Sequence, residues 1–210
     1  MEISISHATK YIRKALILDD VNLKLSGGKV YGICGPNGSG KTMLMRLIAG
    51  LIRPTSGEVI IDGQKLGVNI DFPPSLGIMI EQPAFVASYT GFRNLQLLAQ
   101  IQGKITNEQV RNTIIDVGLV PDDLRKYRKY SLGMKQRLGI AAAIMECPDI
   151  ILLDEPTNAL DTSGAQQICQ LIKRECSRGA LVMVASHDGR LLENISDEIL
   201  YVTQGKVSKR

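Results

Sequence analysis

The order of apolar and polar positions along the chain predicts strands towards both ends and helices in the middle. Val21, Leu23 and Leu25 alternate with polar residues, which is typical of an edge strand with one buried face. Unbroken apolar runs predict buried strands at 30–34, 76–80, 150–153 and 181–185. Short hairpins are predicted at 58–66 and 199–207. Helical spacing predicts helices at 43–49, 93–102, 106–118, 131–147 and 164–178. This order is typical of an α/β core with a mostly helical insertion.

The composition fits one ordinary globular domain. The chain has 210 residues, of which 44% are hydrophobic and 22% are charged. Its net charge of +4 neither requires nor excludes a nucleic-acid or membrane-surface partner. The first residues do not resemble a signal peptide, and no apolar run reaches the roughly 18 to 20 residues of a membrane span, so we expect a soluble chain. Cys34, Cys147, Cys169 and Cys176 lack Cys-x-x-Cys spacing, which predicts buried free thiols in a reducing compartment.

A glycine-rich loop with the spacing of a phosphate-binding P-loop lies between the run at 30–34 and the helix at 43–49. We expect nucleotide phosphates to contact its eight residues, which are Gly35, Pro36, Asn37, Gly38, Ser39, Gly40, Lys41 and Thr42. The glycines let backbone N–H groups point at anionic oxygens, and the next helix adds its positive N-terminal dipole. Lys41 supplies a charge for the β- and γ-phosphates, and the Thr42 hydroxyl is a ligand for Mg²⁺. A plain glycine turn is the weaker interpretation, because every fixed position of the motif is filled.

Two carboxylates follow four consecutive large aliphatic residues. Asp154 and Glu155 therefore come where open α/β sheets bind ligands, at the carboxyl end of a buried strand. We expect Asp154 to hold Mg²⁺ opposite Thr42, and Glu155 to polarise the water that attacks the γ-phosphorus. Taken singly, Asp161 is either a site residue or a helix cap, and His187 is either a catalytic histidine or a solvated loop residue.

Taken in order, these motifs resemble the nucleotide-binding domain of an ABC transporter over essentially the whole chain. The resemblance identifies the P-loop as Walker A and the carboxylate pair as the end of Walker B. It implies that Tyr11 stacks on adenine and that Gln82 contacts Mg²⁺ and the attacking water. It also implies that His187 is the switch histidine and that Asp161 belongs to the D-loop.

The family's signature sequence is present in an altered form at 130–137. Leu132 and Met134 replace a glycine and a glutamine, while Ser131 and Gly133 remain. The resemblance implies that these two retained residues contact the γ-phosphate of a nucleotide bound to the opposite subunit, from a helix N-terminus. The altered form is similar to that of bacterial exporters of antibiotics and peptides. The sequence specifies neither the cargo nor the direction of transport.

The resemblance implies a P-loop NTPase of ABC type, with a RecA-like, mostly parallel core, an antiparallel β subdomain and a helical subdomain at about 85–147. These parts form a single ATPase domain over 1–210. The implied activity is Mg²⁺-dependent ATP hydrolysis, with two chains, expected to be identical, closing head to tail around two ATP molecules. A separate transmembrane permease is the second implied partner, and nucleic acid is not one. We therefore expect the chain in the cytoplasm, at the inner face of the membrane.

The helical insertion after Gln82 is the expected docking surface for the permease. A basic stretch lies just before the signature, at Arg125, Lys126, Arg128 and Lys129. It either belongs to that surface or is a solvated charge cluster, and both interpretations stay open.

Other classes of protein share parts of this pattern. A soluble iron–sulfur-cluster assembly ATPase would carry the same motifs and is the main alternative. Chromosome-organising ATPases insert a long coiled coil between the two halves of the domain. This sequence has no such insertion between Gln82 and Ser131. A non-catalytic nucleotide-gated regulator would not need Glu155 and His187. A nucleotide kinase would lack the signature and the Asp-Glu pair.

Overall fold

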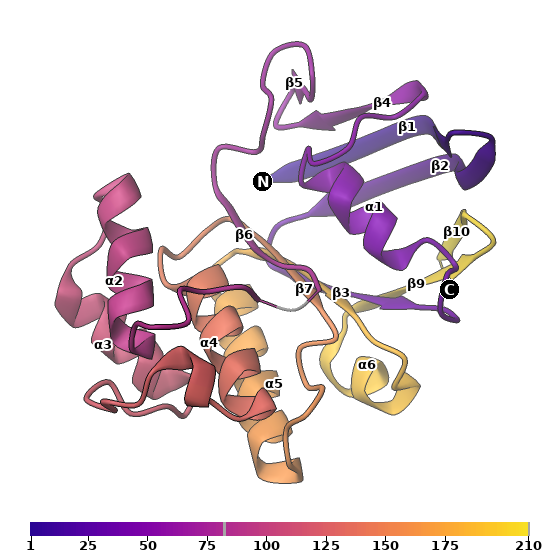
Figure 1. The fold of residues 1–210 in the computed structure, drawn as a ribbon. Helices are drawn as coiled ribbons and strands as arrows, with labels where there is room; N and C mark the ends of the chain where they lie inside the picture. The colour runs from indigo at the N-terminus through magenta and orange to yellow at the C-terminus, as the bar shows by residue number, and fades with distance from the viewer. Residues whose placement is uncertain (82, 210) are drawn as a thin grey trace.

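The computed structural model describes residues 1–81 and 83–209, and Figure 1 shows two sheets with helices packed against them. The strands are β1 (Glu2–Ile12), β2 (Ala15–Ser26), β3 (Lys29–Cys34), β4 (Ser56–Ile61), β5 (Gln64–Lys65), β6 (Leu76–Met79), β7 (Ile150–Asp154), β8 (Leu181–Ala185), β9 (Glu198–Thr203) and β10 (Lys206–Lys209). The helices are α1 (Lys41–Ile48), α2 (Gly91–Gln102), α3 (Asn107–Asp116), α4 (Leu132–Ile144), α5 (Thr162–Ser177) and α6 (Gly189–Ile195), with a short 3-10 helix, η1 (Tyr127–Lys129). The predicted strands and helices are present, whereas β1 and α6 were not predicted.

A mostly parallel sheet forms the centre of the molecule, as the sequence predicted. Its strands lie in the order β10-β9-β3-β8-β7-β6, and β10 alone among them pairs antiparallel in the described chain. Because β3, β6, β7 and β8 run in the same direction, the segments that follow them leave from one edge of the sheet. That edge therefore brings together the P-loop, Glu81, the carboxylate pair and His187.

A second sheet is antiparallel, in the order β2-β1-β4-β5. β2 is an edge strand of it, and Val21, Leu23 and Leu25 are buried as their alternation predicted. β1 begins with the same alternation, since Ile3 and Ile5 are buried. Its pairing with β2 then shifts register beyond Ile5, around a positive φ of 48° at residue 7. This irregularity broke the period that would have identified the strand.

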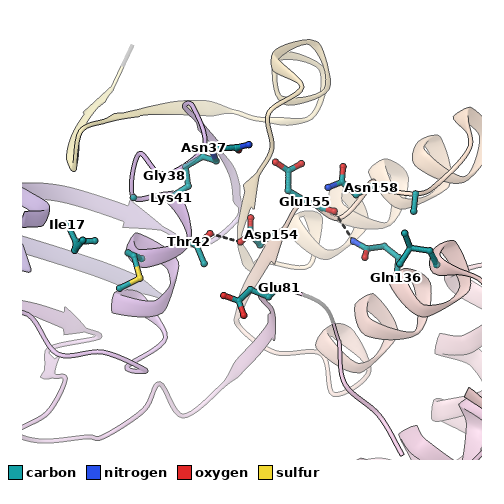
Figure 2. Close-up of a pocket in the computed structure, with 14 residues that line it drawn as sticks. Ile17, Asn37, Gly38, Lys41, Thr42, Glu81, Gln136, Asp154, Glu155 and Asn158 are labelled. Atoms are coloured by element: carbon teal, nitrogen blue, oxygen red, sulfur yellow. Dashed lines mark hydrogen bonds between the residues drawn. The ribbon is translucent and has the colours of Figure 1, made fainter. Parts of the chain in front are cut away.

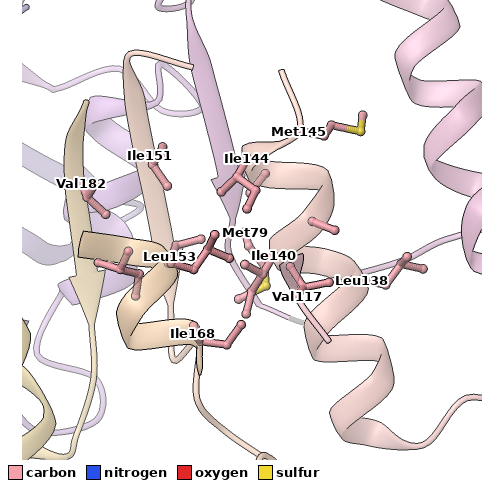
Figure 3. Packing of buried hydrophobic residues seen from close by; sticks show 14 of the residues in the cluster. Met79, Val117, Leu138, Ile140, Ile144, Met145, Ile151, Leu153, Ile168 and Val182 are labelled. Atoms are coloured by element: carbon pink, nitrogen blue, oxygen red, sulfur yellow. The ribbon is translucent and has the colours of Figure 1, made fainter. Parts of the chain in front are cut away.

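The central sheet is apolar on both faces, which explains its unbroken aliphatic runs. On β7, Ile151 and Leu153 face one cluster of buried side chains, and Ile150 and Leu152 face another. The first cluster packs the sheet against α4 and α5, and Figure 3 shows Ile140, Ile144 and Ile168 there. The second cluster joins the same sheet to α1 and the antiparallel sheet.

The helices between β6 and β7 lie together at one side of the molecule (Figure 1). Thr106 starts α3 with the predicted capping box, in which its side chain and that of Gln109 exchange hydrogen bonds with the backbone. Ser131 caps α4, because its Oγ accepts from the N–H of Met134 at 3.2 Å. Among the described residues, no helix combines the length and the apolar character needed to cross a bilayer.

The four cysteines are free, as predicted, but they are not fully buried. Cys147 is exposed, and Cys34, Cys169 and Cys176 are partly buried. The prediction of buried thiols is therefore wrong. Cys147 lies in the turn between α4 and β7 with a φ of 52°, and this turn runs over the surface.

Candidate active site

The P-loop connects β3 to α1 at the carboxyl edge of the parallel sheet. Gly40 precedes α1 with a φ of 112°, a conformation open mainly to glycine. No side chain of the described residues caps this helix end. The first N–H groups of α1 therefore remain for a ligand, and the helix dipole favours an anionic one. This cradle fits a nucleotide phosphate.

The ammonium of Lys41 lies within this loop. The residue is only 7% exposed, and its Nζ donates to the carbonyl oxygens of Gly35 at 2.7 Å and Pro36 at 3.1 Å. Its charge is therefore held beside the cradle before any phosphate is bound. Phosphate oxygens would replace the two carbonyl acceptors with stronger, charge-assisted ones.

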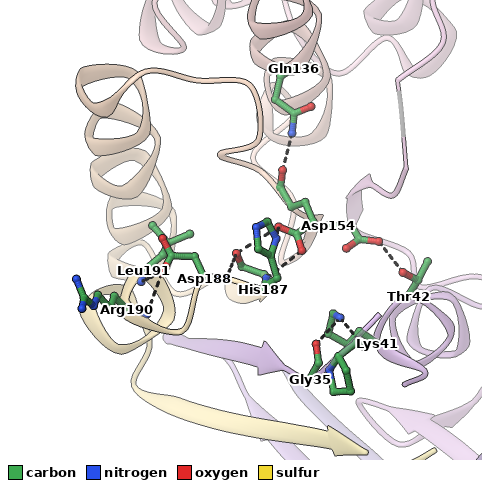
Figure 4. Close-up of polar contacts among 12 residues, drawn as sticks. Gly35, Lys41, Thr42, Gln136, Asp154, His187, Asp188, Arg190 and Leu191 are labelled. Atoms are coloured by element: carbon green, nitrogen blue, oxygen red, sulfur yellow. Dashed lines mark hydrogen bonds and ion pairs between the residues drawn. The ribbon is translucent and has the colours of Figure 1, made fainter. Parts of the chain in front are cut away.

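Thr42 and Asp154 meet across the site, although they are 112 positions apart in the chain. Thr42 Oγ1 donates to Asp154 Oδ2 at 2.7 Å, as Figure 4 shows. Burial raises the pKa of the Asp154 carboxyl, and the negative charge of Glu155 adds to the rise, while the Thr42 hydrogen bond opposes it. A hydroxyl and a carboxylate on facing elements are hard oxygen ligands, so the pair fits Mg²⁺, which usually uses one or two carboxylates together with substrate phosphates.

Glu155 and His187 also lie in contact. Glu155 Oε1 accepts from the backbone N–H of His187 at 3.0 Å, and Oε2 lies 2.9 Å from the imidazole Nδ1. The hydroxyl of Ser186 donates to the same Oε2 at 3.3 Å. These contacts fix the direction of the carboxylate at the end of β7, beside the end of β8. A carboxylate so held is suited to act as a general base.

A groove of about 580 Å³ runs along the P-loop and the carboxylate pair, and Figure 2 shows its lining, of which His187 is not a part. The predicted residues in its wall are Asn37, Gly38, Gly40, Lys41, Thr42, Asp154 and Glu155. Residues that the sequence analysis did not assign also line it, namely Ile17, Met43, Glu81, Leu132, Gln136, Asn158 and Ala159. Its volume is in the range of pockets that hold small organic ligands.

Tyr11 lies on β1 and is not one of the residues that line this groove. It is 46% exposed, and its backbone N–H donates to Thr55 Oγ1 at 3.0 Å. Its cross-strand partner is Leu16, and the following residue, Ile17, lines the groove. Stacking of Tyr11 on adenine stays a prediction.

Asp161 performs the capping role that was one of its two interpretations. Its Oδ1 accepts from the N–H of Gly164 at 2.9 Å at the start of α5, and Oδ2 accepts from Ser163 Oγ at 3.1 Å. These hydrogen bonds lower the pKa of its carboxyl. A role in nucleotide binding stays a prediction, as does that of Gln82, which lies outside the described residues.

The altered signature lies at the exposed N-terminus of α4. Ser131 caps the helix, and Leu132 is 57% exposed with its side chain in the groove lining. A Cβ atom on Gly133 would come 2.7 Å from the carbonyl oxygen of Ala159, so the helix end lies close against the segment after β7. Contact of Ser131 and Gly133 with a partner's nucleotide stays a prediction.

Gln136 contacts Glu155, and the sequence did not predict this contact. Its Nε2 donates to the backbone carbonyl oxygen of Glu155 at 2.8 Å (Figure 4). Its position within the signature segment was the available signal. The partner is 19 positions away, and its identity depends on how α4 packs on the sheet.

Comparison with known proteins gives consistent matches. A family model described as ABC transporter matches residues 18–158. The uncharacterized ABC transporter ATP-binding protein YybJ of Bacillus subtilis (strain 168) is 40% identical over 98% of this chain and 94% of its own length. The bacitracin transport ATP-binding protein BcrA of Enterococcus faecalis is 38% identical over 97% of this chain and 67% of its own.

A solved structure matches the whole fold. It is the dimeric post-hydrolysis state of the ATP-binding cassette MJ0796 bound to ADP and Pi, with a TM-score of 0.87 and 27% identity, covering 99% of this chain and 97% of that one. These relatives favour the transporter interpretation over a soluble iron–sulfur-cluster assembly ATPase. The P-loop, the carboxylate pair and the matches along the chain together show that it belongs to the ABC transporter family, as one of its ATP-binding and ATP-hydrolysing subunits.

Proposed function

We propose that this chain hydrolyses Mg²⁺-ATP in the groove at the carboxyl edge of its parallel sheet and thereby drives a separate permease. The observation that carries the proposal is the meeting of two pairs at one edge, Thr42 with Asp154 at 2.7 Å and Glu155 with His187 at 2.9 Å. Each pair joins a residue from another segment to a carboxylate at the end of β7. This arrangement suits phosphoryl transfer, in which positioning and electrostatics supply most of the catalysis.

The residues from Gly35 to Thr42 would bind the phosphates, with Lys41 on the β- and γ-phosphates. Thr42 and Asp154 would hold Mg²⁺, together with Gln82. When bound, Mg²⁺ would neutralise part of the negative charge of the phosphates. The Asp154 carboxylate oxygen that now accepts from Thr42 would be the hard oxygen ligand for the metal.

Glu155 would act as the general base. A water molecule attacks the γ-phosphorus, Glu155 takes its proton, and the bond from phosphorus to the β–γ bridging oxygen breaks to leave ADP and phosphate. His187 would assist from the other side of the carboxylate. Because its Nδ1 contacts Glu155, we expect its Nε2 to meet the γ-phosphate.

Two identical chains would form the working unit. Ser131 and Gly133 of one chain would complete the γ-phosphate site of the other, with the N-terminus of α4 as the anion-binding element. The dimeric state of the MJ0796 cassette supports a second chain. Without the partner, the site lacks these donors, so hydrolysis by one isolated chain should be slow.

A permease would dock on a helical subdomain at about 85–147, within the single ATPase domain, and would keep the chain at the cytoplasmic face of the membrane. Beside η1, Arg125 pairs with Asp123 at 2.7 Å, while Lys126, Arg128 and Lys129 are exposed and support a place in this surface. The relative BcrA is named for bacitracin transport. This likeness supports a peptide antibiotic as the cargo and export as the direction of transport.

The Glu155→Gln variant tests this proposal, because it removes the base and a negative charge but keeps the side chain's size. General-base loss should lower turnover about 100- to 10,000-fold. ATP should still bind, so in size-exclusion chromatography with ATP and Mg²⁺ the variant should elute as a dimer and the wild type mainly as a monomer. Adding Ser131→Arg should abolish the dimer, since a bulky cation cannot occupy the tight contact with the partner's γ-phosphate.

Full turnover of Glu155→Gln would refute its role as the base. A variant that stays monomeric at every ATP concentration would contradict ATP-driven pairing of isolated chains. Repeating the measurement with the permease present would then separate weak pairing, caused by Leu132 and Met134, from pairing that needs the permease.

A further inference from the structure

Glu155 has a backbone conformation that residues with side chains adopt rarely. Its φ is 50°, in the left-handed region, and such a conformation persists where surrounding contacts determine it. Its N–H donates to the carbonyl oxygen of Ala185 at 2.8 Å. Its own carbonyl oxygen accepts from the N–H of Asn158 at 3.2 Å and from Gln136 Nε2 at 2.8 Å. The direction of the Glu155 side chain therefore depends on these backbone contacts as well as on the contacts of its carboxylate with Ser186 and His187.

Gln136 differs from the other two partners because it belongs to α4, outside the sheet and the loops at its edge. Ser131, which caps α4, is five positions earlier in the same helix. Arg137 ties that helix to its neighbours, since it donates to the carbonyl oxygen of Val117 and to Gln167 Oε1. A shift of α4 as one body would therefore move Ser131 and Gln136 together.

We infer that Gln136 is a positioning residue that links the place of α4 to the direction of the Glu155 carboxylate. The inference rests on the proposed function, in which Glu155 is the base and Ser131 meets the partner's nucleotide. When α4 is seated, the Gln136 amide stabilises the left-handed conformation of Glu155 through its carbonyl oxygen. Binding of the partner's nucleotide at Ser131 would thereby affect how Glu155 orients the attacking water, through the hydrogen bond from Gln136 to the Glu155 carbonyl oxygen.

The contact has a lesser role in building the fold. Gln136 is partly buried and is not among the buried apolar side chains that join α4 to β7, which include Ile140, Ile144 and Leu153. β7 is held by its own ladder with β6 and β8. Loss of the Gln136 amide should therefore change the rate of hydrolysis far more than the stability of the chain.

The test is Gln136→Met in the full chain, because methionine has a similar length and no hydrogen-bond donor. The matched control is Gln170→Met, at an exposed glutamine on α5. We expect kcat of Gln136→Met to fall about 10- to 100-fold, as for a misplacement of about 1 Å. Its KM, its ATP affinity by titration calorimetry and its melting temperature should match those of the wild type and of Gln170→Met.

The double variant Glu155→Gln/Gln136→Met separates this role from an independent one. If Gln136 acts through Glu155, the double variant should be no slower than Glu155→Gln alone. A normal kcat for Gln136→Met, with or without a raised KM, overturns the inference, and so do losses that multiply in the double variant. If Glu155→Gln is inactive and Gln136→Met has a normal kcat, the inference is overturned but the proposed function is not. A fully active Glu155→Gln overturns the proposed function and this inference with it.

Discussion

Lys41→Ala removes the positively charged side chain of the P-loop. In the structure this ammonium is 7% exposed and donates to two backbone carbonyl oxygens, those of Gly35 and Pro36. The substitution takes a donor from both carbonyls and a positive charge from the phosphate site. Nucleotide binding should weaken, and hydrolysis should be abolished, because charge develops on the phosphoryl oxygens in the transition state.

The size of the binding effect follows from the exchange that Lys41 makes. A hydrogen bond to a charged group contributes about 1.5 to 3 kcal/mol. Nζ must leave the two carbonyl oxygens to reach phosphate, so the net contribution should lie in the lower half of that range. With about 1.4 kcal/mol for each factor of ten, ATP should bind about 10- to 50-fold more weakly.

Isothermal titration calorimetry measures this loss directly. The control is Lys173→Ala, which removes an exposed lysine from α5 and should leave ATP affinity unchanged. Thermal unfolding without nucleotide should show that both variants fold. Unchanged ATP affinity of Lys41→Ala, together with normal turnover, would refute the assignment of this lysine to the phosphates.

Three further predictions concern binding, pH dependence and packing. Tyr11→Ala should weaken ATP binding by about 1 to 3 kcal/mol in the same titration, whereas Tyr11→Trp, which can still stack on adenine, should not. Asp154→Asn should abolish turnover but raise the melting temperature of the nucleotide-free chain at neutral pH, because burial raises the pKa of Asp154 and its charged form costs stability. The folded chain holds the extra proton between the ordinary and the raised pKa, so wild-type stability falls as pH rises through that window, and the gain should vanish in acid. Gly77→Ala should lower unfolding stability in urea by about 1 to 3 kcal/mol, since its Cβ would overlap the Ala143 carbonyl oxygen, whereas Gly189→Ala meets open space.

Each of these predictions has a contrary outcome. Equal ATP affinity of all Tyr11 variants would mean that this residue only packs on β1. If the difference in melting temperature between Asp154→Asn and the wild type does not change with pH, a raised pKa of the Asp154 carboxyl is contradicted. Equal stability of Gly77→Ala and Gly189→Ala would show that β6 and the end of α4 have room for a methyl group.

The elements that the sequence predicted correctly are those whose signal is local. The P-loop residues are consecutive, and the aliphatic run before Asp154 reflects burial on both faces of β7, which requires no knowledge of distant partners. The capping box at Thr106 was likewise visible within four residues. The resemblance to a family implied site roles for both Glu155 and His187 but not their contact, which follows from the neighbouring positions of β7 and β8 in the sheet.

The rest depended on geometry that the sequence does not carry. β1 was missed because its alternation stops where its register with β2 shifts beyond Ile5. The contact of Gln136 with the Glu155 carbonyl oxygen requires the seating of a helix on a sheet, and the left-handed φ of Glu155 has no sequence signal. For Asp161, the sequence offered two roles, and the structure shows the cap without excluding the other.

The exposed thiol at the turn between α4 and β7 makes the chain convenient for spectroscopic labelling. Cys147 is the exposed cysteine, whereas Cys34, Cys169 and Cys176 are partly buried, and burial raises the pKa of the thiols of Cys169 and Cys176. Because the thiolate is the reactive form, a maleimide probe should attach to Cys147 ahead of those two. A fluorophore or spin label there would report on α4 relative to the sheet without adding a cysteine to the natural sequence.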